Sequence, residues 1–198
     1  MSATLQQIVL ASGNAGKIRE IQALLPNYPI VAQSAFDITE AEETGLSFVE
    51  NAIIKARNAA LHSGLPAIAD DSGLVVDTLH GAPGVLSARY AGAAANDWDN
   101  LQKVLQALDG VPDTERTARF VCVMVFMQHA EDPLPVIAQG VWVGRILHQP
   151  KGENGFGYDP IFWVPELDCA AAELSAEAKN ALSHRGKALK TLVASIKA

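Results

Sequence analysis

The chain has 198 residues, 49% of them hydrophobic, and its 22 acidic and 15 basic residues give a net charge of −7. A chain of this length and composition can bury one sizeable core, so we expect a single domain over residues 1–198. The acidic balance argues against a protein that coats a nucleic acid polymer. The longest apolar run, residues 120–127, is too short to cross a bilayer, and the N-terminus lacks a signal-peptide pattern. We therefore expect a soluble cytoplasmic protein without a membrane partner.

The two cysteines, Cys122 and Cys169, are far apart and form no CxxC pair. Neither a disulfide framework nor a zinc site is indicated. Cys122 lies in the apolar run and is expected in the core.

The first elements alternate between strand and helix. Residues 7–11 read as a strand, and the glycine loop SGNAGK leads into a helix with apolar residues at helical spacing. A short strand is expected over 30–32. Ser47 and Glu50 form a capping box, which predicts the start of a helix there. Its expected apolar face carries Val49, Ile53, Ala56 and Ala60, with Asn51, Lys55 and Asn58 on another face.

The middle of the chain predicts strands separated by turns. Residues 65–69 and 74–76 are apolar runs, and the turn chemistry of DDSG between them predicts two strands that are joined or interrupted there. A loop rich in glycine and proline spans 81–92. A helical pattern over 96–108 stops at Gly110 and Pro112.

The second half is expected to contain several adjacent strands. Candidates are residues 118–128, 136–142 and 145–148, separated by turns with proline or glycine. A glycine-rich loop over 151–160 precedes a strand at 161–164, and the remainder reads as helical with an N-cap at Ser183. These elements predict an α/β fold with a mixed β-sheet and flanking helices.

The loop from Ser12 to Lys17 is a candidate anion site. It lies where a strand leads into a helix, so its backbone N–H groups could bind phosphate while Lys17 supplies a positive charge. It is not a Walker A loop, because Ala11 stands at the first glycine position and Ile18 at the Ser/Thr position. A glycine turn between strand and helix is structural about as often as it is functional.

Two acidic motifs could hold a metal ion. On an extended backbone the neighbouring side chains of Asp70 and Asp71 would point to opposite faces, so one could face a ligand while the other braces the loop. Phosphate hydrolysis needs carboxylates to hold Mg²⁺ and to accept a proton from water. The EETG motif, which contains Glu42, offers a second acidic site. Taken alone, each motif reads as a solvated turn.

Three further segments carry candidate ligand-binding side chains. Lys55 lies on the polar face of its helix, although a single lysine there is usually solvated. The segment Phe156–Asp159 places aromatic rings beside a glycine and an acid, and could stack a base or only form a turn. His184 and Arg185 at a helix start, with Lys179 one turn earlier, could donate to a ligand.

Taken together, the motifs resemble those of the inosine/xanthosine triphosphate pyrophosphatases along essentially the whole chain. No single segment is specific, but their ordered occurrence is. The segments are SGNAGK (12–17), EETG (42–45), ENAIIKA (50–56), ADDSGL (69–74), GAPGVLSARYAG (81–92), GFGYDP (155–160) and SHRGKALK (183–190). Leu86 departs from the tyrosine that many members carry in the GAPG loop.

The resemblance implies two lobes around a central nucleotide cleft, a homodimer, and Mg²⁺-dependent hydrolysis of ITP, dITP and XTP to the monophosphate and pyrophosphate. It implies that Glu42 and Asp71 hold Mg²⁺, with Asp71 also the catalytic carboxylate. The implied substrate-binding residues are Ser12, Gly13, Asn14, Ala15, Gly16, Lys17, Lys55, Ser72, Phe156, Gly157, Tyr158, Asp159, Lys179, His184 and Arg185.

Several alternatives stay open at the level of sequence. A metal ligand is a poor base because Mg²⁺ lowers its proton affinity, so Asp70 or a metal-bound hydroxide could share that role with Asp71. A donor opposite the 6-keto group, from His184 or Arg185, would reject ATP. The competing functions are a pyrophosphatase for pyrimidine or modified nucleotides, a nucleotide sensor without turnover, and a structural module.

Overall fold

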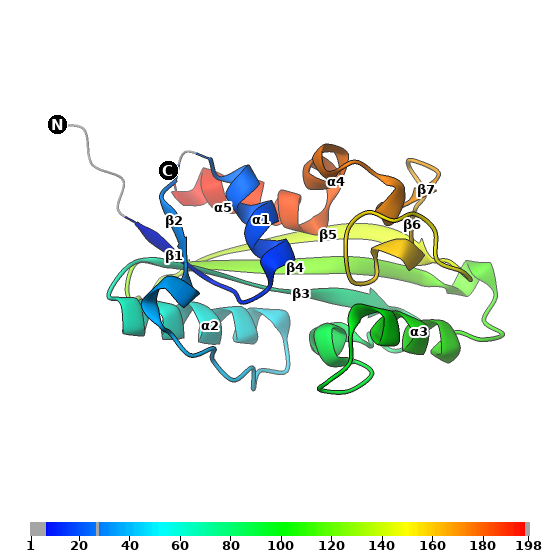
Figure 1. The fold of residues 1–198 in the computed structure, drawn as a ribbon, viewed down its shortest axis with the longest axis horizontal. Helices are drawn as coiled ribbons and strands as arrows, with labels where there is room; N and C mark the ends of the chain where they lie inside the picture. The colour runs from blue at the N-terminus through cyan, green and yellow to red at the C-terminus, as the bar shows by residue number, and fades with distance from the viewer. Residues whose placement is uncertain (1–6, 27, 197–198) are drawn as a thin grey trace. The chain divides into compact units, whose positions relative to one another are not determined.

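The computed structural model describes residues 7–26 and 28–196, and within them the chain forms one seven-stranded sheet with flanking helices (Figure 1). The strand order is β2-β1-β3-β4-β5-β6-β7. The strands are β1 (Ile8–Ala11), β2 (Ile30–Ala32), β3 (Ala67–Val76), β4 (Thr117–Met127), β5 (Val136–Ile146), β6 (Phe162–Val164) and β7 (Cys169–Ala170). The helices are α1 (Ala15–Leu24), α2 (Phe48–Ser63), α3 (Asp97–Ala107), α4 (Ala176–Leu182) and α5 (His184–Ile196).

The sheet is mixed, as predicted. Strand β1 pairs in parallel with β2 and with β3, with Val9 opposite Val31 and Ala67. Strand β6 pairs antiparallel with β5 and with β7. The predicted α/β class is therefore confirmed. No helix in the described part of the chain is long and apolar enough to cross a membrane.

The chain divides into two compact units. The first comprises the residues up to Asp71, Val123–Gln139 and the residues from Ala188 onward. In this unit α1 and α2 lie on opposite sides of β1 (Figure 1). The strand is buried on both sides, as Val9 and Leu10 show. A strand covered on both faces reads as a continuous apolar run, which is the pattern of IVLA in β1.

The second unit comprises Ser72–Cys122 and Gly140–Lys187. Its core is built around three aromatic rings. The centroid of Phe120 lies 4.5 Å from that of Phe162, and the centroid of Trp142 lies 5.4 Å from that of Phe162. Helix α3 adds Leu101 and Val104 to this cluster. Such tilted ring pairs contribute beyond the area that they bury.

Helix starts follow the predicted capping chemistry. The Ser47 hydroxyl accepts from the backbone N–H of Glu50 at the start of α2. Asn96 and Asp99 form a complete capping box at α3, which was not predicted from the sequence. The buried face of α2 is rotated from the predicted one: Ala52, Ala56, Ala59 and Ala60 are buried, whereas Val49 and Ile53 are half-buried.

The two strands predicted around DDSG are one continuous strand, so that prediction was wrong. Strand β3 runs from Ala67 to Val76 without a turn. Gly73 is required there by close approach, because a Cβ would overlap the carbonyl oxygen of Gly84 and the hydroxyl of Ser87. Pairing with neighbouring strands thus outweighs the local turn preference of Asp-Ser-Gly.

The strands predicted over 136–142 and 145–148 are also one strand. Strand β5 continues through Gly144, where a Cβ would overlap the Phe162 ring and the Trp163 carbonyl of β6.

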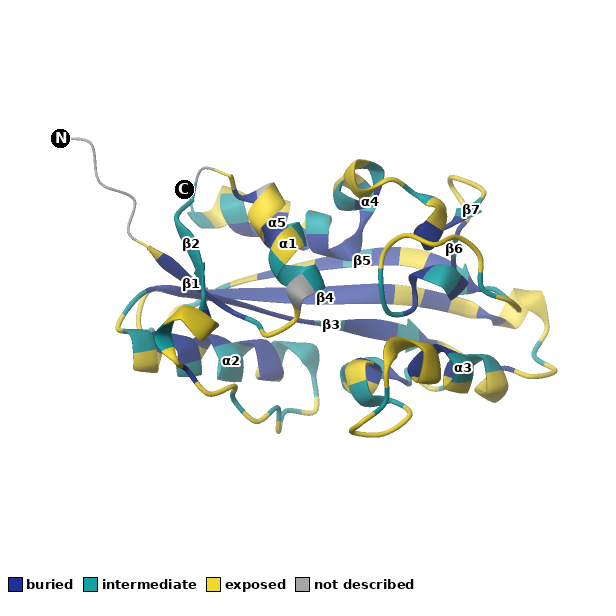
Figure 2. Ribbon diagram, viewed as in Figure 1, coloured by how far each residue is buried: buried dark blue, intermediate teal, exposed yellow. Residues whose placement is uncertain are grey.

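The C-terminal part is less helical than expected, because it contains β7 before α4. Ser183 does accept from the N–H of Gly186 at the start of α5, as predicted. Figure 2 shows β4 as a buried strand, and Cys122 lies in the core as expected.

Candidate functional site

The extended backbone of β3 places the side chains of Asp70 and Asp71 on opposite sides of the strand. Lys17 of α1 lies 3.0 Å from Asp70, and Lys55 of α2 lies 3.2 Å from Asp71. Both carboxylates are buried, with exposed fractions of 1% and 5%. Two predicted lysines therefore meet two predicted aspartates, each pair on its own side of the strand.

The loop between β1 and α1 is ordered by its own polar side chains. The Asn14 side chain caps α1 by accepting from the N–H of Lys17 at 3.1 Å, and the Ser12 hydroxyl accepts from the N–H of Asn14 at 3.2 Å. Gly13 has the Glu40 carboxylate directly against its Cα, so a side chain there would overlap it. Ala15 and Gly16 begin the helix. The loop and Lys17 thus stand at a helix N-terminus, where anions are favoured.

Hydrogen bonds and ion pairs connect Asp71 to residues of α2 and of the EETG motif. Lys55 also lies 2.7 Å from Glu43, and Asn51 donates to Asp71 at 3.2 Å. The other end of the same Asn51 amide accepts from the N–H of Gly45 at 2.8 Å. Asn51 therefore ties the EETG loop to the catalytic candidate. In the sequence, Asn51 could be found as a candidate because it lies on the same face of the predicted helix as Lys55.

The pKa shifts in this network have opposing causes. Burial raises the pKa of Asp71, and the nearby ammonium groups of Lys55 and Lys17 offset this only in part. Burial by itself would lower the pKa of Lys55, but the carboxylates of Asp71, Asp70 and Glu43 outweigh it, so that pKa is raised. Asp71 thus has an increased proton affinity, while Lys55 stays charged.

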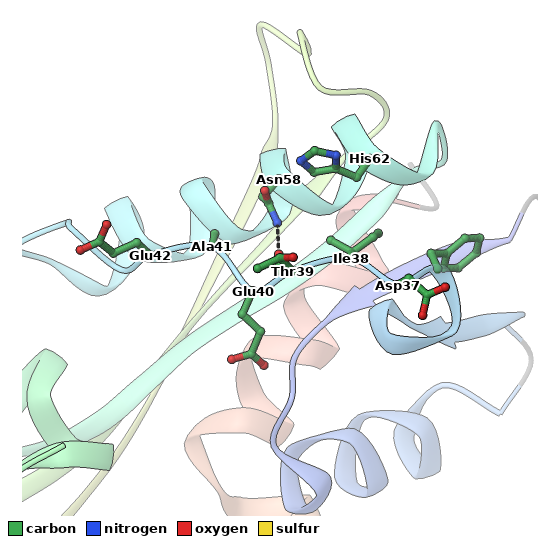
Figure 3. Close-up of a pocket in the computed structure, with 9 residues that line it drawn as sticks. Asp37, Ile38, Thr39, Glu40, Ala41, Glu42, Asn58 and His62 are labelled. Carbon is green, nitrogen blue, oxygen red and sulfur yellow. Dashed lines mark hydrogen bonds between the residues drawn. The ribbon is translucent and has the colours of Figure 1, made fainter. Parts of the chain in front are cut away.

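Glu42 is the predicted metal ligand, and it lies apart from these contacts. It is exposed and lines a cavity of about 440 Å³, which Asn58 and His62 reach from α2 (Figure 3). The contact to Lys55 is made instead by its neighbour Glu43, which was not singled out in the sequence. Among the described residues, no group of three or more His, Cys, Asp or Glu side chains is arranged to hold a metal ion.

The second unit carries the other predicted residues, beginning with the loop of Phe156. Lys179 of α4 forms a buried ion pair with Asp159 at 2.7 Å, and Asp159 also accepts from the N–H of Phe156 at 2.8 Å. The Phe156 ring is half-buried, with the Lys179 ammonium 4.6 Å and the Arg185 guanidinium 5.8 Å from its centroid. An aromatic face and two cations therefore come together here.

The remaining predicted residues are buried around this loop. Arg185 donates to the Ser72 hydroxyl at 3.1 Å, and the His184 ring stacks on Phe120 at 4.8 Å between centroids. Tyr158 is buried, and its hydroxyl donates to the Ser87 carbonyl at 2.7 Å. Its burial raises its pKa, so it stays neutral. The Tyr158 side chain belongs to the core, where it anchors the loop.

The two sets of residues have complementary chemistry. The first unit offers lysines, helix N–H groups and carboxylates, which suit phosphates and a hard cation. The second offers an aromatic ring with buried donors, which suits a planar heterocycle.

Known proteins are similar to this chain in sequence and in fold. The chain is 60% identical to the dITP/XTP pyrophosphatase of Vibrio parahaemolyticus over 196 residues, which cover 98% of each protein. It is 59% identical to the dITP/XTP pyrophosphatase of Yersinia pestis over 191 residues, or 96% of this chain and 97% of that one. The structure of a HAM1 protein from Coxiella burnetii matches with a TM-score of 0.90 and 52% identity, covering 97% of this chain and 98% of that chain. The sequence matches the Ham1 family over residues 8–195, and the chain therefore belongs to that family.

Proposed function

We propose that this protein hydrolyses dITP, XTP and ITP at the α-phosphate, releasing the monophosphate and pyrophosphate. The observation that carries the proposal is the cluster of Lys55, Asp71, Glu43 and Asn51, in which a buried carboxylate is held between a lysine and an amide. Relatives about 60% identical over nearly the full length bear the name dITP/XTP pyrophosphatase, which supports the same substrates here.

The phosphate chain is assigned to residues of the first unit. The loop Ser12–Lys17 offers backbone N–H groups at the N-terminus of α1, and Lys17 offers an ammonium group. Lys17 is 16% exposed in its side chain, so it can reach a ligand while it remains beside Asp70. Two lysines of α1 and α2 would offset the charge of the triphosphate on a protein that is acidic as a whole.

A divalent cation fits the carboxylates around Lys55. Asp71 and Glu43 are hard oxygen donors that share one ammonium partner, and one or two carboxylates are the usual protein ligands of Mg²⁺. We assign the cation to Asp71 and Glu43, and prefer Glu43 to Glu42 because of this shared contact. When bound, Mg²⁺ would polarise the phosphoryl oxygens and stabilise pyrophosphate as a leaving group.

Proton transfer is assigned to Asp71 and not to Asp70. Asp71 is the aspartate that contacts Lys55 and Asn51, beside which the phosphates and the cation are assigned, so its carboxylate is the one placed to accept a proton from water. Burial raises its pKa, and a bound Mg²⁺ would offset part of this rise. Asp70 forms an ion pair with Lys17 on the other side of the strand. Its carboxylate therefore serves to orient Lys17 and to hold the loop that precedes α1.

The purine is assigned to residues of the second unit. The Phe156 ring offers a stacking face, and Lys179 and Arg185 offer donors beside it. A donor is satisfied by the 6-keto group of hypoxanthine or xanthine, whereas the 6-amino group of adenine would leave it unpaired. This asymmetry supports a preference for keto purines over ATP.

A homodimer in the cytoplasm completes the proposal. Ile137 and Val143 on β5 are 50% and 69% exposed, and we name them as candidates for contacts between the protomers. The cytoplasm is where the proposed substrates would be removed from the nucleotide pool.

A panel of nucleoside triphosphates tests the proposal. ITP, dITP, XTP, GTP, ATP and dUTP are incubated with the protein and Mg²⁺, and pyrophosphate and orthophosphate are measured separately. We expect pyrophosphate from the first three, with slower turnover of the others. Orthophosphate as the first product, or a preference for ATP or dUTP, would overturn the proposal.

A further inference from the structure

The loop that carries Phe156 is fixed by a small number of polar contacts. Gly155 and Gly157 have positive φ angles of 78° and 62°, so the backbone bends sharply on both sides of Phe156. The N–H of Phe156 is bound by Asp159 from within the loop. The orientation of the next peptide group fixes the backbone ψ angle of Phe156, which limits the directions that its ring can take.

That next peptide is bound from outside the loop by α3. The N–H of Gly157 donates to Asp97 Oδ2 at 2.7 Å. Asp97 is the first residue of α3, and the helix N-terminus favours its negative charge. The bond spans 60 positions of sequence and joins the loop tip to an element that carries none of the predicted site residues.

Asp97 is not needed to cap its own helix. The capping box of α3 is made by Asn96 and Asp99, whose side chains accept from each other's backbone N–H groups at 3.0 Å and 3.1 Å. The two first-turn carboxylates of α3 therefore have separate tasks. Asp99 holds the helix start, and Asp97 holds the loop of Phe156.

We propose that Asp97 is a positioning residue for recognition of the base: by fixing the Phe156–Gly157 peptide it holds the Phe156 ring beside Lys179 and Arg185. The inference rests on the proposed function, because it assumes that Phe156 stacks on the purine. Losing this bond leaves the phosphate-binding residues and Asp71 untouched. The effect therefore belongs to binding of the base and not to the chemical step.

Steady-state kinetics with ITP at saturating Mg²⁺ test the inference. Asp97→Ala should raise KM about tenfold, the effect expected for one lost hydrogen bond to a charged acceptor, with kcat within about twofold. Asp97→Asn keeps an acceptor oxygen and should restore KM to within about threefold of the wild type. Inhibition by tripolyphosphate, which has no base, should be equal in the wild type and in Asp97→Ala.

Asp99→Ala is the matched control, since it damages the same helix start without touching Gly157. It should lower the melting temperature at least as much as Asp97→Ala and leave KM unchanged. An unchanged KM in Asp97→Ala, or an equal rise in Asp99→Ala, would overturn the inference. If the wild type releases no pyrophosphate from ITP, the proposed function fails. The IMP dissociation constants of the wild type and Asp97→Ala then decide the inference separately, and equal constants would reject it.

Discussion

At the scale of single residues, the neighbours Asp70 and Asp71 form ion pairs with two different lysines. Alternation along β3 directs one carboxylate to Lys17 and the other to Lys55. The sequence predicted that the two aspartates point to opposite faces if the DDSG segment is extended. It did not predict that this segment lies within one uninterrupted strand. Spacing placed Asn51 on the same helical face as Lys55, but it could not reveal Glu43, because the contact of Glu43 with Lys55 depends on how α2 packs against the EETG loop.

Asp71→Asn should separate binding from chemistry. The amide retains the size of the side chain and a hydrogen-bond acceptor, but it loses the charge assigned to the cation and to proton transfer. We expect kcat for ITP to fall by at least about 10²-fold, the usual effect of losing a positioned acid–base group. Binding of ITP should persist through Lys17, Lys55 and the loop N–H groups.

Asp70→Asn is the control for this variant. It weakens the ion pair to Lys17 and should mainly lower the melting temperature. Measuring kcat, ITP affinity and thermal melts for both variants decides between the two aspartates. A folded Asp71→Asn protein with near-normal kcat, or a larger loss of kcat in Asp70→Asn, would refute the assignment.

At the scale of elements, the sequence predicted the helices better than the strand boundaries. Helix α2 begins at Phe48, next to the capping residue Ser47 that predicted it, and α3 begins at Asp97, within the predicted range 96–108. The two merged strands were divided wrongly because Gly73 and Gly144 read as turn residues. Each is a glycine because another chain segment approaches too closely for a Cβ. Such long-range contacts leave no local pattern.

Arg116 links the end of α3 to the end of β5 in the second unit without serving the site. The residue is 2% exposed, and its guanidinium donates to the carbonyl oxygens of Leu108, Ile146 and Leu147 at 2.7 to 2.9 Å. We expect Arg116→Met to cost roughly 3–5 kcal/mol of unfolding free energy, because buried carbonyls lose their donors. This corresponds to a fall in melting temperature on the order of 10 °C.

Arg119→Met on β4 is the comparison for Arg116→Met. Arg119 pairs with Asp77 at the surface, and an exposed ion pair contributes at most about 1 kcal/mol. The kcat of both variants, measured well below their melting temperatures, should stay near that of the wild type. Equal stability of the two variants would show that the three bonds to Arg116 do not hold these elements together.

At the scale of the whole molecule, an acidic protein must bind a polyanionic ligand. The net charge of −7 disfavours a triphosphate, and the lysines that oppose this are gathered around two buried aspartates. The sequence motifs singled out the two lysines and the two aspartates that the structure brings into contact. They could not predict which carboxylate of EETG meets Lys55, since Glu42 and Glu43 differ by only one position along the loop.

The response of thermal stability to Mg²⁺ should identify that carboxylate. A cation that binds only the folded chain raises the melting temperature in proportion to the logarithm of its concentration, once the site is saturated. We expect such a rise for the wild type and for Glu42→Gln, and a clearly smaller one for Glu43→Gln and Asp71→Asn.

Na⁺ at matched ionic strength corrects for general screening of the acidic surface. Since this measurement needs no substrate, it tests the cation site independently of the reaction. A loss of the Mg²⁺ effect in Glu42→Gln, with a normal effect in Glu43→Gln, would return the assignment to Glu42.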